Sequence, residues 1–145
     1  MRLALLGMAA MLLAGCAVTP RVAAPAAVLA SAPAGLGSVA ADAVRRLAGW
    51  HPPGATRWVL QRPATDAFGL ALVDRLRREG YAVEEVAAAR GTAAASDGAL
   101  LDYVFEPLDA GVYRLSLRVG PRTLSRAYGT GNGQMAPVGA WSHGE

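Results

Sequence analysis

The sequence predicts an α+β fold: a small two-layer sandwich in which two helices cover one face of a mostly antiparallel sheet of about five strands. Two segments carry apolar residues at helical spacing, and short segments rich in β-branched and aromatic residues lie around and after them. One of these segments alternates strictly between apolar and polar residues. The chain has 145 residues, enough for one domain, and its 32 alanines imply a small core.

The first fifteen residues are predicted to be a lipoprotein signal peptide. Arg2 precedes an apolar run over residues 3–13, which is too short to span a bilayer as a helix. The segment Leu13-Ala14-Gly15-Cys16 matches the lipobox of bacterial lipoproteins, so we expect Cys16 to carry a diacylglycerol. The alternative is an ordinary signal peptide with an incidental cysteine, which would leave a free thiol in an oxidising compartment.

Residues 16–37 are predicted to form a tether behind this lipid anchor. Prolines at positions 20, 25 and 33 oppose a helix despite the many alanines. Two possibilities remain open: an extended spacer, or a segment that becomes ordered by threading into a partner ring. Ala17 follows the cysteine where an aspartate would favour the inner membrane. By analogy with enteric lipoproteins, we expect the periplasmic face of the outer membrane.

Residues 38–145 are predicted to form a single α+β periplasmic domain that begins with a helix. Ser38 is the expected N-cap of a helix over residues 39–47, which places Val39, Ala43 and Leu47 on one stripe. A second helix is expected between a cap at Thr65 and a terminating Gly80.

Five strands are expected around these helices. Tyr113 to Val119 alternates cleanly and predicts a half-buried antiparallel strand. The strand–helix–strand unit from Trp58 to Val83 is expected to be parallel and right-handed. Residues 87–98 are expected to be a loop and residues 107–111 a turn. The predicted element order is α-β-α-β-β-β-β, with strands at residues 56–61, 81–86, 100–106, 113–119 and 122–128.

The chain carries no recognisable catalytic or metal-binding constellation, so we expect no enzyme, cofactor, metal or small-molecule substrate. The glycine-rich run 129–133 does not lead into a helix, as a phosphate-binding loop must, and is interpreted as a surface turn. His51 is expected to close a loop, and His143 to belong to a frayed terminus. Asp102 is expected to face away from the core.

The arginines are the most prominent candidates for a binding surface. Arg114 and Arg118 share the polar face of one predicted strand, and Arg122 and Arg126 lie on the next. Together they form either a basic patch for an anionic lipid, glycan or acidic partner, or a solvated sheet face that discourages aggregation. The net charge of +3, without interleaved exposed aromatic residues, argues against nucleic-acid binding. Trp141 is expected either to dock on its own domain or to anchor a partner.

Four segments carry a resemblance to a known family: TDAFGLALVDRLRREGYAV at 65–83, YRLSLRVG at 113–120, LSRAY at 124–128 and PVGAW at 137–141. In this order and spacing they resemble the TrbH family of conjugal-transfer lipoproteins. The resemblance runs from about Leu47 to Trp141 and implies a small structural lipoprotein of a plasmid mating-pair-formation type IV secretion channel. It implies no catalytic residues, and it implies TrbG-like and TrbI-like outer-membrane core proteins as neighbours.

The leading hypothesis is therefore a lipid-anchored structural protein of a conjugation channel, with Arg114, Arg118, Arg126 and Trp141 as candidate partner contacts. One alternative is an envelope-binding lipoprotein whose arginine face contacts peptidoglycan or lipopolysaccharide. Another is a pilotin-like chaperone that escorts an outer-membrane ring and then leaves it.

Overall fold

The structure, a computed structural model, describes residues 33–86 and 97–144. Two helices and seven strands occur in this part of the chain, and their order along it interleaves one helix with the first two strands. The elements are α2 (Leu36–Ala48), β1 (Arg57–Leu60), α3 (Ala67–Arg78), β2 (Ala82–Glu85), β3 (Ala99–Asp109), β4 (Val112–Val119), β5 (Arg122–Gly131), β6 (Gln134–Pro137) and β7 (Ser142–Gly144).

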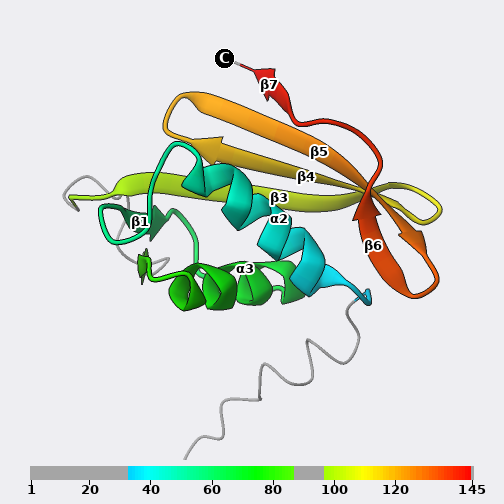
Figure 1. Cartoon of the computed structure of the whole chain (residues 1–145), viewed down its shortest axis with the longest axis horizontal. Coiled ribbons are helices and arrows are strands. Elements are labelled where there is room, and N and C mark those ends of the chain that lie inside the picture. The colour runs from blue at the N-terminus through cyan, green and yellow to red at the C-terminus, as the bar shows by residue number, and fades with distance from the viewer. Residues whose placement is uncertain (1–32, 87–96, 145) are drawn as a thin grey trace, which may run out of the picture.

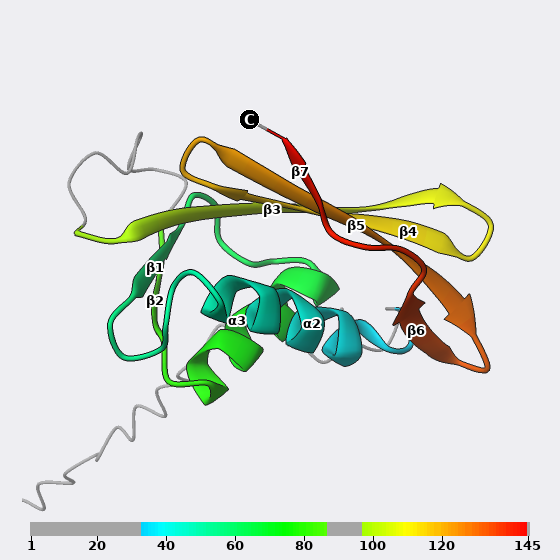
Figure 2. The same cartoon turned by 45° about the horizontal axis from the view of Figure 1, so that its top comes forward.

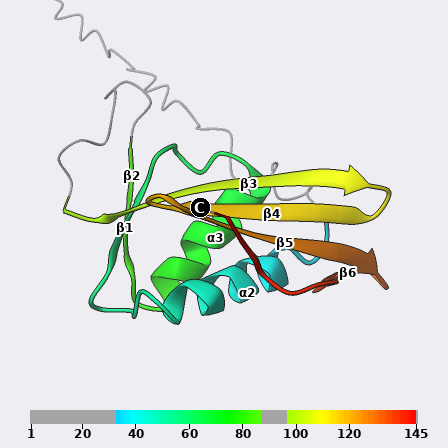
Figure 3. The ribbon, with the colours of Figure 1, turned by 90° about the horizontal axis from the view of Figure 1, so that it is seen from above.

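The fold is the predicted two-layer α+β sandwich, with both helices on one face of the sheet (Figures 1 and 2). The strand order is β2-β1-β3-β4-β5-β6, and β7 also pairs with β5. The view from above shows the long strands β3, β4 and β5 running side by side over the helices (Figure 3). The strands on either side of α3, β1 and β2, are parallel as predicted. All pairings from β3 to β7 are antiparallel.

The core lies between the helices and the inner face of the sheet. Tyr113 to Val119 forms β4 as predicted, and its alternation places Leu115 and Leu117 inside. Trp58 from β1 and Phe68 from α3 are the largest apolar side chains that are almost completely buried. The helix α2 contributes aliphatic side chains to this core. Its buried residues are Leu36, Val39, Ala40, Ala43, Val44 and Leu47.

The two predicted N-caps are wrong by three residues and one residue, whereas Gly80 follows the end of α3 as predicted, with a positive φ of 88°. α2 begins after Gly35, which has a left-handed backbone (φ 93°) and lies so close to β6 that a Cβ would be 2.5 Å from the Met135 nitrogen. Ser38 lies inside the first turn and donates to the Met135 carbonyl oxygen at 2.9 Å. The N-cap of α3 is Asp66 rather than Thr65, and its carboxylate accepts from the Gly69 amide at 2.9 Å.

The predicted turn at 107–111 is mostly strand, because β3 continues to Asp109. Pro107 has no amide hydrogen and would disrupt a central position. It is tolerated because β1 pairs only with residues 99–101, which leaves this part of β3 without a second strand neighbour among the described residues. A register shift between Pro107 and Asp109 then leads to the turn before β4.

Two strands, β6 and β7, were not predicted. The glycine-rich run is the end of β5 plus a two-residue turn in which Asn132 and Gly133 both have positive φ, the geometry that joins tightly paired antiparallel strands. β6 and β7 then pair in turn with two different stretches of β5. His143 therefore lies in a strand opposite Leu124, and the prediction of a frayed terminus is wrong.

Several predictions concern segments outside the described residues. These are the signal peptide, the lipobox with Cys16, most of the tether and residues 87–96 of the predicted loop. Within the described part, the tether boundary at residue 37 falls inside α2. Neither described helix is long and apolar enough to cross a membrane.

The packing of α3 on β3 gives a first testable prediction. A Cβ at Gly69 would lie 1.8 Å from the Tyr103 hydroxyl oxygen. Gly69→Ala is therefore expected to lower the free energy of unfolding by about 1–3 kcal/mol through overpacking, although alanine favours a helix over glycine. Urea denaturation measures the difference.

The matched control is Gly37→Ala in α2, where a Cβ would meet no atom within 4 Å. This variant is expected to gain about 0.5–1 kcal/mol from helix propensity. Equal stabilisation by both substitutions would contradict the close approach of Tyr103 to α3.

Candidate docking surfaces

The predicted arginine patch is divided between the two faces of the sheet. Arg126 pairs in register with Leu115, and Arg122 with Val119, so both lie on the inner side of β5. Arg114 and Arg118 alternate with these inner residues and point outward. The prediction that all four arginines form one surface is therefore wrong. The two arginines of β4 lie on the outer face of the sheet, and the two arginines of β5 lie on the inner face.

On the outer face, Arg114 is already neutralised by a carboxylate. Its Nε donates to Glu106 of β3 at 3.0 Å, and a second guanidinium nitrogen contacts the same oxygen. Arg118 lies in register with Asp102, but Asp102 accepts from Arg62 at 2.8 Å instead. Asp102 faces away from the core as predicted. This face is consequently a mixed polar surface rather than a basic one.

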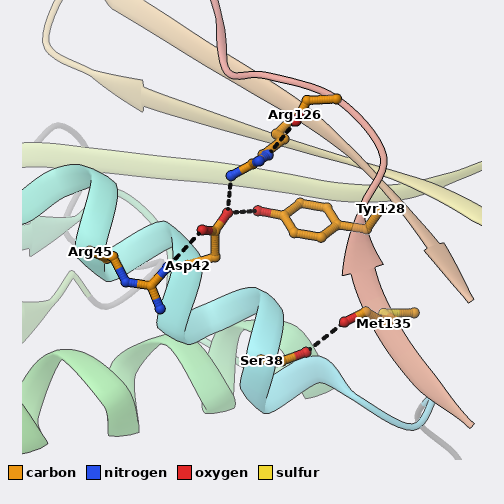
Figure 4. A network of polar contacts seen from close by, with 7 residues as sticks. Ser38, Asp42, Arg45, Arg126, Tyr128 and Met135 are labelled. Carbon is orange, nitrogen blue, oxygen red and sulfur yellow. Dashed lines mark hydrogen bonds and ion pairs between the residues drawn. The ribbon is translucent and has the colours of Figure 1, made fainter.

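On the inner face, Arg126 takes part in a network around Asp42 of α2 (Figure 4). One oxygen of Asp42 accepts from Arg126 and from the Tyr128 hydroxyl, each at 2.8 Å. Its other oxygen accepts from Arg45 at 3.2 Å. We call these four residues, Asp42, Arg45, Arg126 and Tyr128, the Asp42 cluster. It joins one turn of α2 to β5.

Apart from Arg45, whose side chain is exposed, the Asp42 cluster is largely shielded from solvent. The side chains of Asp42 and Arg126 are 15% and 20% exposed, and Tyr128 is buried. Burial raises the pKa of Tyr128 above its ordinary value, and its hydrogen bond to Asp42 raises it further. Tyr128 therefore remains a neutral donor that holds α2 against the sheet.

A second tyrosine–aspartate pair joins α3 to the sheet. The Tyr103 hydroxyl of β3 donates to Asp66 at 2.5 Å, on the oxygen that the Gly69 amide does not use. Burial, followed by this bond to Asp66, raises the pKa of Tyr103. Beside the pair is an open groove of about 510 Å³, lined also by Arg62 and Phe105. Its two charged side chains are already engaged, because Arg62 donates to Asp102 and Asp66 accepts from Tyr103. The residues that line it offer no nucleophile–base arrangement.

Trp141 docks on its own domain, one of the two possibilities left open by its position in the sequence. It is half-buried and packs against the core. The Arg126 guanidinium lies 5.9 Å from the centre of its ring, and Arg126 Nε donates to the Gly139 carbonyl at 2.7 Å. Arg126 and Trp141 are therefore brought together, but as part of the structural framework.

A cluster that the sequence did not reveal surrounds Trp50, just after α2. Arg46 and Arg122 lie near its ring, and His143 of β7 lies beside it. The contact between Arg46 and Trp50 could have been predicted from the sequence, because residues four positions apart are neighbours on a helix. Arg122 and His143 come together with Trp50 only through the pairing of β5 with β7, which the sequence did not predict. In the described residues, no three His, Cys, Asp or Glu side chains are grouped so as to hold a metal ion.

Comparisons with known proteins give one match. A family model described as "Conjugal transfer protein TrbH" matches residues 21–145. Neither the curated proteins nor the solved structures include a match to this chain.

The Asp42 cluster predicts that loss of the Asp42 carboxylate lowers the free energy of unfolding. Asp42→Asn removes the acceptor charge from Arg126 and weakens the bond to Tyr128, both shielded from solvent. The variant is expected to lose about 1–3 kcal/mol of unfolding free energy in urea. Asp74→Asn is the control, because Asp74 is an exposed aspartate of α3 that pairs with Arg78. Its urea midpoint is expected to stay unchanged, and equal losses in the two variants would contradict the Asp42 cluster.

Tyr103 and Tyr128, two of the buried tyrosines, predict a loss of stability in alkali. Above pH 10 the unfolded tyrosines release protons, while the folded Tyr103 and Tyr128 retain theirs because their pKa values are raised. The unfolding free energy should hold below about pH 10 and then fall by about 1.4 kcal/mol per pH unit for each tyrosine. In Tyr128→Phe the slope between pH 10 and 11 should be shallower by one such step, and an unchanged slope would contradict the assignment.

Proposed function

The chain belongs to the TrbH family of conjugal transfer proteins, and we propose that it is a structural lipoprotein of the conjugation channel. In this proposal the Cys16 lipid anchors it in the outer membrane, on the periplasmic face. The tether holds the α+β domain away from the lipid surface. The domain docks on TrbG-like and TrbI-like core proteins of a mating-pair-formation type IV secretion system.

The observation that carries the proposal is the family match, which covers both helices and all seven described strands. The lipobox adds independent support, because it lies upstream of the matched region and concerns a different property of the chain. The described surface also favours a structural role. The groove of about 510 Å³ beside Tyr103 and Asp66 is lined in part by groups engaged in holding the fold.

The envelope-binding alternative has less support than the channel role. It requires the outer arginines to act together on an anionic polymer, whereas Arg114 is paired with Glu106 and Arg126 faces inward. Arg118 is then the one of the three candidate arginines that has no carboxylate within 4.0 Å among the described residues. A single exposed arginine gives little affinity for such a polymer. The pilotin-like alternative differs from the channel role in whether the protein stays with the mature assembly.

If Cys16 carries the lipid anchor, Cys16→Ser is expected to release the domain from membranes, because acylation requires the thiol. Plasmid transfer is expected to fall as a consequence. Fractionation of donor cells and mating frequency on filters measure the two effects. Wild-type transfer by a donor whose Cys16→Ser protein is fully soluble would contradict the anchoring role.

Ala17→Asp is the matched variant, since it keeps the thiol and changes only the sorting residue. It is expected to remain lipidated but to move to the inner membrane, which density-gradient separation of the two membranes detects. Reduced mating by this variant, with its acylation intact, would show that the outer membrane is the site of action. Wild-type mating from the inner membrane would contradict that location.

A further inference from the structure

The Trp50 groove is formed by three segments that are distant in sequence. Trp50 follows α2, Arg122 begins β5, and His143 lies in β7 along the edge of the sheet (Figure 1). Trp50 is 38% exposed, one of the few large apolar side chains at the surface. The groove beside it has a volume of about 210 Å³, and Arg46 of α2 borders Trp50. The term Trp50 groove refers to this concavity together with Trp50, Arg46, Arg122 and His143.

The positive charges in this groove have no carboxylate partner among the described residues. Eight of the described arginines lie within 4.0 Å of a carboxylate, but Arg46 and Arg122 do not. Their guanidinium carbons instead lie 4.5 Å and 5.8 Å from the centre of the Trp50 ring. In a domain where most arginines are neutralised, two free ones beside the same exposed aromatic ring form a local excess of charge.

Arg46 is also incompletely hydrogen-bonded. Its Nε is buried and has no acceptor in the described structure, which is costly for a charged donor. One terminal nitrogen lies 2.5 Å from Nε2 of His143. An imidazole accepts a hydrogen bond in its neutral form, so this contact uses the acceptor of His143 without supplying negative charge. Among the residues that the structure describes, the groove therefore has donors and lacks anionic acceptors.

From this arrangement we propose that the Trp50 groove binds an acidic peptide segment of a partner protein. Its carboxylates would pair with Arg46 and Arg122, while an adjacent apolar or aromatic side chain packs on Trp50. Assignment of that partner to the transfer apparatus rests on the function proposed above. The chemistry of recognition does not, because it follows from the free cations and the exposed ring.

A protein segment fits this groove better than a membrane surface does. Binding to anionic lipid adds small contributions from four to eight basic residues spread over a face. Here two arginines converge on one ring beside a concavity about the size of one or two side chains. Such a geometry suits a short segment in which a carboxylate and an apolar group are close together.

The test measures binding of a fluorescein-labelled acidic peptide to the purified full chain in neutral detergent. The probe is the pentapeptide Glu-Asp-Phe-Asp-Glu with blocked ends, and the reference is Gln-Asn-Phe-Asn-Gln. Fluorescence anisotropy is expected to show saturable binding of the acidic probe that weakens with added salt, and at least tenfold weaker binding of the neutral one. Equal affinity for the two peptides would overturn the proposal.

Arg46→Gln and Arg122→Gln are each expected to weaken binding of the acidic probe about tenfold, through loss of a charge-assisted hydrogen bond. Arg118→Gln is the matched control. It removes one positive charge from the same hairpin, also without a carboxylate partner among the described residues, but on the outer face of the sheet. Thermal unfolding of each variant verifies that the domain remains folded. An equal loss in all three variants would indicate general charge attraction and overturn the site.

Two further measurements separate the site from a membrane role and from the channel role. Vesicles with 30% anionic lipid are expected to bind the wild type and Arg122→Gln equally; tenfold weaker binding of the variant, without peptide binding, would assign the groove to lipid. In donor cells, Arg122→Gln is expected to reduce mating while Cys16-dependent fractionation stays normal. Peptide binding that depends on Arg122, combined with wild-type mating, would keep the site and contradict its use in transfer.

Discussion

The attachment of α2 to the sheet through Asp42 is the interaction on which the arrangement of this domain depends. The buried face of α2 consists of leucine, valine and alanine side chains, and apolar packing of this kind is not directional. The carboxylate of Asp42 supplies direction where apolar packing does not, since Arg126 and Tyr128 reach it only in one register of helix against strand. The position of the helix end, and hence of Trp50 against β7, follows from this contact.

A similar hydrogen bond from a sheet tyrosine to an aspartate holds α3, where the Tyr103 hydroxyl donates to Asp66. In both pairs a sheet tyrosine contributes its ring to the core and its hydroxyl to a helix carboxylate. Satisfied polar contacts of this kind rigidify a core and select one packing arrangement. Gly69 leaves room for the Tyr103 hydroxyl, so the small residue and the polar contact depend on each other.

Sequence patterns predicted the elements whose apolar spacing is regular. The stripe of α2 and the alternation of β4 were sufficient, because each follows one period over several residues. The inward position of Arg126 was also available, since Leu124 and Tyr128 share its parity along β5. β6 and β7 were missed because they are short, and because Pro137 and Gly139 at and after the end of β6 argue against a strand. The Trp50 groove depends on β7, so the residues that complete it could not be recognised before that pairing was known.

The proposed structural role rests on membership of the TrbH family of conjugal transfer proteins. The most direct test is detergent solubilisation of plasmid-bearing donor cells, affinity capture of the tagged chain and separation by size. Co-elution with a high-mass ring at fixed stoichiometry is the result predicted for a channel subunit. Elution at monomer size, with no ring proteins, would contradict the structural role, and substoichiometric recovery with the ring would favour an assembly chaperone.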